Sequence, residues 1–355
     1  MGMKHIFAMR QCQSLRWNFI WYAVLAGVAL TFVLASGSVS AQEAGPYLNA
    51  EKVMGPERCA ECHKDTHEIW KQSHHSKTFR AMPRSKKAKK IAKKLGIKRV
   101  KKDKTCRTCH FTAALTDGKE KLIAGISCES CHGGAKEWIT AHSNYGGPKI
   151  TRETETVEHR AERIAMTKAA GMILPAGIYQ VAENCFQCHT VPMEKLVNVG
   201  GHPAGSNFEL VSWSQGEIRH NVWYSGGKSN PEVSPERKRI MYIVGRALDL
   251  EYALRGVAKA TKKKKYAVAM AKRAARAKKH MHAVGELVSN SDIEDILALA
   301  NGAELKLNNE AALLDAAAKL KEVTSRFALT AEGSAFAEID SLIPGSDKYK
   351  GAAVE

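Results

Sequence analysis

Four copies of the pentapeptide Cys-x-x-Cys-His are the residues here whose types and spacing point most directly to chemistry. Two thiols at this spacing can add to the two vinyl groups of one porphyrin, and the adjacent imidazole can bind its iron. The pattern therefore predicts four covalently attached haem c groups. The motif residues are Cys59, Cys62 and His63; Cys106, Cys109 and His110; Cys128, Cys131 and His132; and Cys185, Cys188 and His189.

The same cysteines allow three other interpretations: zinc clips, redox dithiols and disulfides. In an exported protein, eight cysteines would ordinarily suggest four disulfides. Zinc sites and redox dithiols also use Cys-x-x-Cys, but neither requires a histidine directly afterwards. Histidine makes up only 14 of the 355 residues, so its presence after all four pairs is not a chance result. Haem is the preferred interpretation.

Two segments of this region resemble a known family. They are CAECHKDTHEIWKQSHHSKTF (59–79) and GISCESCHGGAKEWITAH (125–142). Both are similar to haem segments of the cytochrome c-554 family, periplasmic tetrahaem cytochromes whose haem packing is shared with hydroxylamine oxidoreductases. The likeness covers roughly residues 55 to 190. It implies closely stacked haems that pass electrons, with His75 and His142 each binding the iron of a haem other than the adjacent one.

The sequence also departs from that family. Gln180 occupies the place, five residues before the last motif, where the family has a histidine, and the sequence after His189 does not follow the family pattern. The resemblance further implies that the second haem, held by His110, has an open iron position. A haem iron with one histidine can take a second histidine, take methionine or stay open, and this choice separates an electron carrier from a catalyst.

Two later histidines are candidates for the missing ligands. His202 lies in Gly-Gly-His-Pro-Ala-Gly, whose glycines permit close approach of the backbone to a flat cofactor. His220 lies between Trp213 and Trp223, which would suit a haem edge. The alternative for each is a loop or packed histidine without a ligand role. If His75, His142, His202 and His220 all bind iron, every haem has two histidines and no open iron remains.

The elements that must position these residues are predicted to be mainly α. Large apolar porphyrins supply much of the core themselves, so we expect short helices and long loops around four haems, with hardly any sheet. A Cys-free α-helical region follows. Ser234 and Pro235 predict the start of a helix over 234–261, Asn290 begins another, and a third over 307–328 starts near Asn308 or Asn309.

We divide the chain into a signal peptide (1–41), a tetrahaem cytochrome c domain (42–230) and an α-helical C-terminal region (231–355). The first segment combines basic residues, an apolar run over 19–35 and a small-residue cleavage pattern ending at Ala41. This predicts export to the periplasm. An uncleaved membrane anchor, or an extracellular location, is the alternative.

The net charge of +18 is concentrated in two segments. Residues 84–104 contain twelve Lys or Arg and one Asp, and residues 259–279 contain ten Lys or Arg and no acid. We expect Lys86–Lys104 to dock acidic redox partner proteins. A solvated helix face and an anionic membrane surface are the alternatives. Nucleic acid is not an expected partner of an exported haem protein, and oligomerisation stays open.

These observations predict an exported tetrahaem c-type cytochrome that relays electrons between redox partners, an electron-transfer protein rather than an enzyme. The alternative is an oxidoreductase acting on nitric oxide, hydroxylamine or a similar nitrogen compound at a five-coordinate haem. A third interpretation, an extracellular cytochrome that polymerises, ranks below both.

Overall fold

The computed structural model describes residues 48–354, all of which belong to one compact unit, Gly45–Glu355. The predicted signal peptide lies outside the described residues. Within residues 48–354, no helix is long and apolar enough to cross a membrane. The predicted mainly α class is confirmed, because helices dominate and the described part of the chain contains one small sheet.

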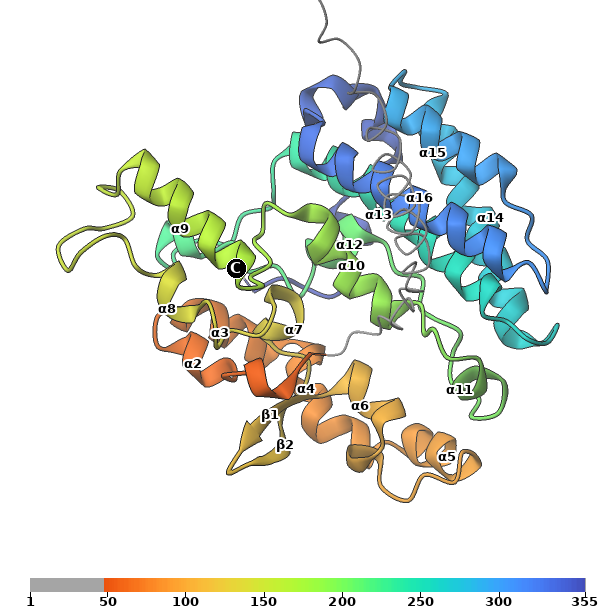
Figure 1. Ribbon diagram of the computed structural model, residues 1–355, viewed down its shortest axis with the longest axis horizontal. Coiled ribbons are helices and arrows are strands. Elements are labelled where there is room, and N and C mark those ends of the chain that lie inside the picture. The colour runs from red at the N-terminus through yellow and green to blue at the C-terminus, as the bar shows by residue number, and fades with distance from the viewer. Residues whose placement is uncertain (1–47, 355) are drawn as a thin grey trace, which may run out of the picture. The chain divides into compact units, whose positions relative to one another are not determined.

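The first half of the described chain consists of short helices joined by loops (Figure 1). Its sheet is an antiparallel hairpin turned at Asp117 and Gly118, which both have positive φ angles, as the tight hairpin turn requires. The elements are η1 (Ala50–Lys52), α2 (Pro56–Ala60), α3 (Lys64–Gln72), α4 (His74–Ala81), η2 (Met82–Arg84), α5 (Lys86–Lys94), η3 (Val100–Lys102), α6 (Lys104–His110), β1 (Thr112–Thr116), β2 (Lys119–Ala124), α7 (Cys128–His132), α8 (Ile139–His142) and α9 (Val157–Ala169).

The second half contains the longer helices. They are α10 (Ile178–His189), α11 (Glu194–Asn198), α12 (Leu210–Ser214), η4 (Trp223–Ser225), α13 (Pro235–Ala258), α14 (Lys265–Gly285), α15 (Ser291–Gly302), α16 (Glu310–Thr330), η5 (Gly333–Leu342) and η6 (Ser346–Lys348). Helix α13 packs against α14, α16, η5, α10 and α12, so it forms the centre of a bundle. Helices α10 and α12 precede residue 230, so the boundary at 230 stays a prediction.

The predicted helix starts are confirmed by their caps. The Ser234 side chain accepts a hydrogen bond from the backbone N–H of Arg237, and Pro235 occupies the first turn of α13. The Asn290 side chain caps α15 by accepting from the N–H groups of Asp292 and Ile293. Asn309 is the N-cap residue of α16.

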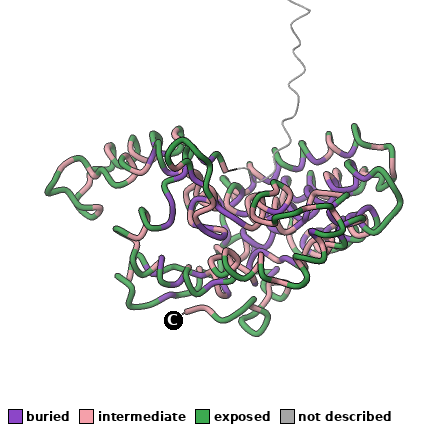
Figure 2. The backbone as a smooth tube through the Cα atoms, turned by 90° about the horizontal axis from the view of Figure 1, so that it is seen from below, coloured by how far each residue is buried: buried purple, intermediate pink, exposed green. Residues whose placement is uncertain are grey.

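The hydrophobic core lies in this bundle. Its cluster of buried residues runs from Ile178 to Ile339, and within the described residues it includes no fully buried member before Ile178. Figure 2 shows buried residues gathered along the bundle, whereas α9, on the left, is mostly exposed. A buried ion pair between Arg273 of α14 and Asp249 of α13 ties the two central helices together. The region of the cysteine motifs therefore has little apolar core of its own.

Candidate cofactor sites

Each Cys-x-x-Cys-His motif is part of a short helix or helical turn. The second and third motifs lie within α6 and α7, and the fourth ends α10. In the first motif the helical turn continues beyond α2, because the N–H of His63 donates to the carbonyl of Cys59 at 2.9 Å. Residues three and four apart share one face of a helix, so the two thiols and the imidazole of each motif face the same way.

The structure brings each motif histidine against one of the four predicted second ligands. The ring centroids are 6.3 Å apart for His63 and His142, 6.4 Å for His110 and His202, 6.3 Å for His132 and His220, and 6.3 Å for His75 and His189. His75 and His142 thus each lie opposite a motif other than the adjacent one.

These separations have a simple chemical meaning. An imidazole nitrogen binds a metal ion at about 2.0 Å and lies roughly 1.2 Å from its ring centre, so two imidazoles on opposite sides of one ion have centroids about 6.3 Å apart. The rings are too far apart for direct stacking and leave room for one atom between them. This geometry fits a haem iron between the two rings.

Hydrogen bonds orient several of these rings. In four histidines, Nδ1 lies within hydrogen-bond distance of a backbone carbonyl, which can only accept, so Nδ1 carries the proton and Nε2 is left free to bind a metal. The pairs are His132 with Ile173 at 2.9 Å, His142 with Ile139 at 2.5 Å, His202 with Pro203 at 2.9 Å and His220 with Ile218 at 2.7 Å.

Burial keeps the motif histidines neutral. Removal from water lowers the pKa of His110 to about 4 and that of His189 to about 4, and nearby histidines add to both effects. Burial also lowers the pKa values of His63, His75, His132 and His142. Neutral imidazole is the form that binds a metal.

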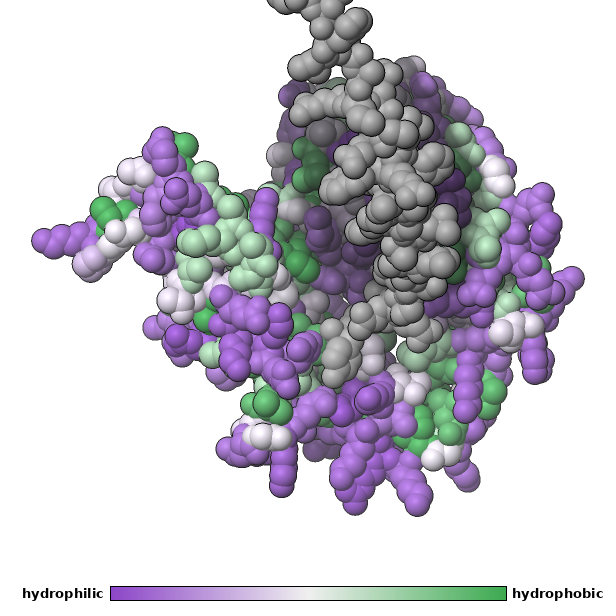
Figure 3. Space-filling model, in the orientation of Figure 1, coloured by the Kyte–Doolittle hydropathy of each residue, from purple (hydrophilic) through white to green (hydrophobic). Residues whose placement is uncertain are grey.

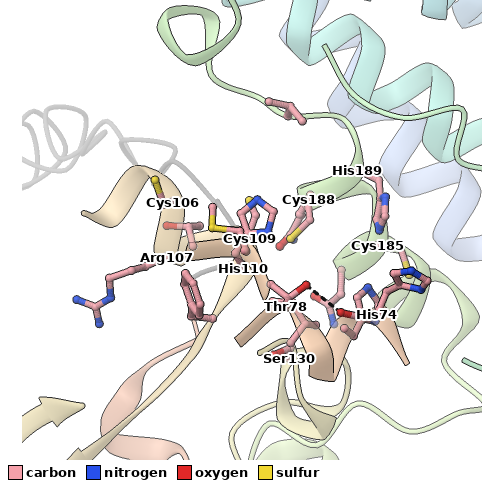
Figure 4. Close-up of a pocket in the computed structure, with 18 of the residues that line it drawn as sticks. His74, Thr78, Cys106, Arg107, Cys109, His110, Ser130, Cys185, Cys188 and His189 are labelled. Carbon is pink, nitrogen blue, oxygen red and sulfur yellow. Dashed lines mark hydrogen bonds between the residues drawn. The ribbon is translucent and has the colours of Figure 1, made fainter. Parts of the chain in front are cut away.

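One cavity of about 1010 Å³ contains two of the four sites. It is lined by the cysteines and histidines of the second and fourth motifs and by His75 and His202, with an apolar wall that includes Ile91, Phe208 and Trp213. Figure 4 shows Cys109 and Cys188 close together between His110 and His189. Small-molecule pockets reach roughly 1,000 Å³. The volume and apolar wall fit large, flat cofactors that complete a core otherwise missing from this region.

The thiols of different motifs are neighbours. A hydrogen bond joins the Cys59 and Cys128 thiols, raising the pKa of Cys59 and lowering that of Cys128, and a similar bond joins Cys109 and Cys188. Burial raises the pKa of Cys131 to about 11. No disulfide joins the eight described cysteines. Nor do residues 48–354 contain a cluster of three or more His, Cys, Asp or Glu able to hold a metal ion by themselves.

Several contacts around the sites were not predicted from the sequence. The buried carboxylate of Glu129, inside the third motif, accepts hydrogen bonds from the backbone N–H groups of Met54, Gly55 and Ala135 at 2.7–2.8 Å. It thereby ties the start of α2 to α7. The sequence shows a charged residue between two motif cysteines. It does not show the hydrogen-bond partners of that residue, because most of them are distant along the chain.

Aromatic rings and one hydroxyl also contact the histidines. Trp223 lies 4.5 Å from His63 and Phe208 lies 4.8 Å from His189 between ring centroids. The Ser206 hydroxyl lies 3.0 Å from Nδ1 of His189. Nothing in the spacing of Ser206 or Phe208 singles them out, because the loop after α11 folds back onto α10 only in the tertiary structure.

The histidines without a predicted ligand role make other contacts. His74 is exposed and pairs with Glu217 at 2.5 Å, and His159 pairs with Glu155 at 2.7 Å. His67 is buried and lies against Trp70. His280 and His282 are half-buried on α14.

Part of the chain is similar in sequence to known proteins. The family described as cytochrome c554 and c-prime matches residues 58–133. The cytochrome c-554 of Nitrosomonas europaea is 32% identical over 126 residues, which cover 33% of this chain and 51% of that protein. The chain thus spans about half the length of this curated relative. No solved structure matches the chain significantly.

Proposed function

We propose that the chain is an exported cytochrome that relays electrons through four haems, because residues 58–133 match the cytochrome c-554 family and 126 residues are 32% identical to a cytochrome c-554. This similarity supports covalently bound haem c and a role in electron transfer. We further propose the number of haems, their ligands, the partners and the periplasmic location. The observation that carries the proposal is the set of four histidine pairs, all at 6.3–6.4 Å.

Each motif would hold one haem by its two thiols and its histidine. The second histidine would be His142 opposite His63, His202 opposite His110, His220 opposite His132 and His75 opposite His189. Bound haem c supplies one-electron chemistry at its iron. The chain's own residues orient the ligand rings and surround them with apolar side chains.

The neighbouring thiols support a relay. Contacts join the first motif to the third through Cys59 and Cys128, and the fourth to the second through Cys188 and Cys109. The Asn184 side chain, next to Cys185, donates to the backbone carbonyl of Cys131 at 3.0 Å, so the third and fourth motifs also adjoin. The four sites follow one another in the order first, third, fourth, second. Electrons would enter and leave near the two ends of this series.

The exposed lysines of 86–104 support an acidic redox partner. Lys87 and Lys104 line the cavity that contains His110, so a partner bound there would lie beside the second site. Opposite charge raises the rate of encounter between redox proteins.

The alternative, an oxidoreductase for a small nitrogen compound, requires an open iron at His110. The ring of His202 lies where such a substrate would bind, so no feature of the described site favours this activity.

Two measurements on the purified protein test the proposal. A pyridine haemochrome assay should give four haems per chain, and two or fewer would refute the assignment. An electron paramagnetic resonance spectrum of the ferric protein should contain low-spin haem alone. A high-spin haem that binds nitric oxide on reduction would overturn the paired ligation of that iron and support the alternative.

A further inference from the structure

The two basic segments, far apart in sequence, meet in the folded protein through α11. At one end of α11, the backbone N–H and hydroxyl of Thr261 both donate to the Glu194 carboxylate, at 3.0 and 2.7 Å. At the other end, Gly200 lies against Ile91 and Leu95 of α5 so closely that a Cβ there would approach them to 3.2 and 3.0 Å. Helices α5, α11 and the start of α14 therefore form one surface (Figure 1).

Most cations on this surface are exposed, and Lys101 is half-buried over the Phe79 ring. Among the described residues, no ion pair within 4 Å involves the basic side chains of 86–104 or those of 262–265, although many other cations of the protein pair with carboxylates. The nearby Glu194 is engaged by backbone groups of 261 and 262, and Asp103 caps α6 by accepting from Thr105. The surface therefore carries a large uncompensated positive charge.

The surface has the composition of a protein–protein interface. Val199, at the end of α11, is 51% exposed, and Val268, in the first turn of α14, is 41% exposed. Figure 3 shows hydrophobic atoms over α11 among hydrophilic side chains. A recess of about 490 Å³ beside α5 is lined by Lys89, Lys93, Lys98, Arg99 and Lys101, without a carboxylate. An apolar centre with a charged rim is typical of protein–protein contacts, whereas a membrane-binding face usually presents bulky aromatic or leucine anchors.

We propose that α5, α11 and the start of α14 form one docking site for the acidic face of a protein, which bridges Lys86–Lys104 and Lys262–Lys265. This inference rests on the proposed electron-transfer function and extends it, because it assigns the C-terminal basic segment to the same partner. Helix α5 places Ile91 and Lys87 on the cavity that contains His110 and turns Lys89 and Lys93 toward the recess. A partner bound at this site is separated from the second haem site by a single helix.

The test measures binding of an acidic peptide, a chain of about twenty glutamates, to the intact haem-loaded protein by calorimetry at low salt. Replacing Lys262, Lys263, Lys264 and Lys265 with glutamine should weaken binding at least tenfold, as should replacing Lys89, Lys90, Lys93 and Lys94. The combined variant should lose binding. Either set should also reduce the dependence of the affinity on salt, because fewer charges are neutralised.

A matched control replaces Lys119, Lys136, Lys149 and Lys228, four exposed lysines outside this surface, and should leave affinity within twofold. Two peptides bound per chain, or no effect of the 262–265 set, would overturn the single bridging site. A different result would be that the protein binds phosphatidylglycerol vesicles more tightly than the peptide, with the lysine variants weakening that binding. This result would overturn the protein partner and identify a membrane surface in its place. Haem content and spin state, measured on the same samples, report separately on the proposed function.

Discussion

The imidazole rings of His110 and His202 face each other with their centroids 6.4 Å apart, although α10 and α11 lie between them in the sequence. Family resemblance implied an open iron at His110. The loop after α11 places the His202 ring opposite His110, with Nδ1 held 2.9 Å from the Pro203 carbonyl. This relationship bears directly on whether the protein carries electrons or acts on a substrate.

His202→Ala should convert about one quarter of the haem iron to the high-spin state, because the iron on His110 would lose its second ligand. Electron paramagnetic resonance of the ferric variant measures this fraction. His159→Gln changes a histidine that pairs with Glu155 outside the ligand set and should leave all haem low-spin. An unchanged low-spin spectrum in the His202 variant would remove this residue from the ligands.

Glu129→Ala should lower the free energy of unfolding by about 2–3 kcal/mol, because three backbone N–H groups lose a buried charged acceptor. Guanidinium unfolding followed by circular dichroism measures the change. Glu137→Ala removes an exposed carboxylate paired with Lys52 and should cost less than about 1 kcal/mol. Equal effects of the two substitutions would contradict the bridging role of Glu129.

Arg273→Met should destabilise the bundle by about 3–5 kcal/mol, since it leaves the Asp249 carboxylate buried without its cation. Burial raises the pKa of Asp249, and the arginine opposes that rise. The double variant with Asp249→Leu should recover part of the lost stability, as the unpaired charge is gone. Urea titrations of both variants provide the comparison, and a double variant no more stable than Arg273→Met would argue against this explanation.

Glu155 should make the loop between α8 and α9 sensitive to acid. Hydrogen bonding to Arg163, with a further contribution from His159, lowers the pKa of Glu155 to about 2 from its ordinary value of 4.5. A lowered carboxyl pKa stabilises the fold above the unfolded value, and that stabilisation is lost as pH falls from 4.5 toward 2. The protection factors against amide hydrogen exchange in residues 143–156, which correct for the intrinsic pH dependence of exchange, should fall over this range in the native protein, whereas Glu155→Gln should show low protection factors at every pH. Identical pH profiles of exchange in the native protein and in Glu155→Gln would contradict the stabilising role of Glu155.

Replacing Lys89, Lys90, Lys93 and Lys94 with glutamine should slow reduction by the anionic complex of iron(II) with EDTA several-fold at low salt. The difference should shrink at high salt, because ions screen exposed charges. Stopped-flow absorbance measures the rates, with neutral hydroquinone as the reductant that should not distinguish the variants. Equal rates with the anionic complex would refute electrostatic steering by α5.

The sequence alone determined the features that depend on local spacing. Thiols three residues apart with an adjacent histidine need only one helical turn to face a porphyrin, so Cys128, Cys131 and His132 were identifiable without a structure. Ser234 and Asn290 were identifiable as helix starts for the same reason, since a capping side chain acts within three residues.

Only the tertiary structure decided which distant groups meet. The pairing of His142 with His63 and the junction of the two basic segments at α11 depend on packing between elements far apart in the chain. Spacing along a helix or strand cannot encode such contacts, because the intervening loops permit many arrangements. One of these arrangements is selected by the buried contacts of the bundle and by the sites around which the short helices fold.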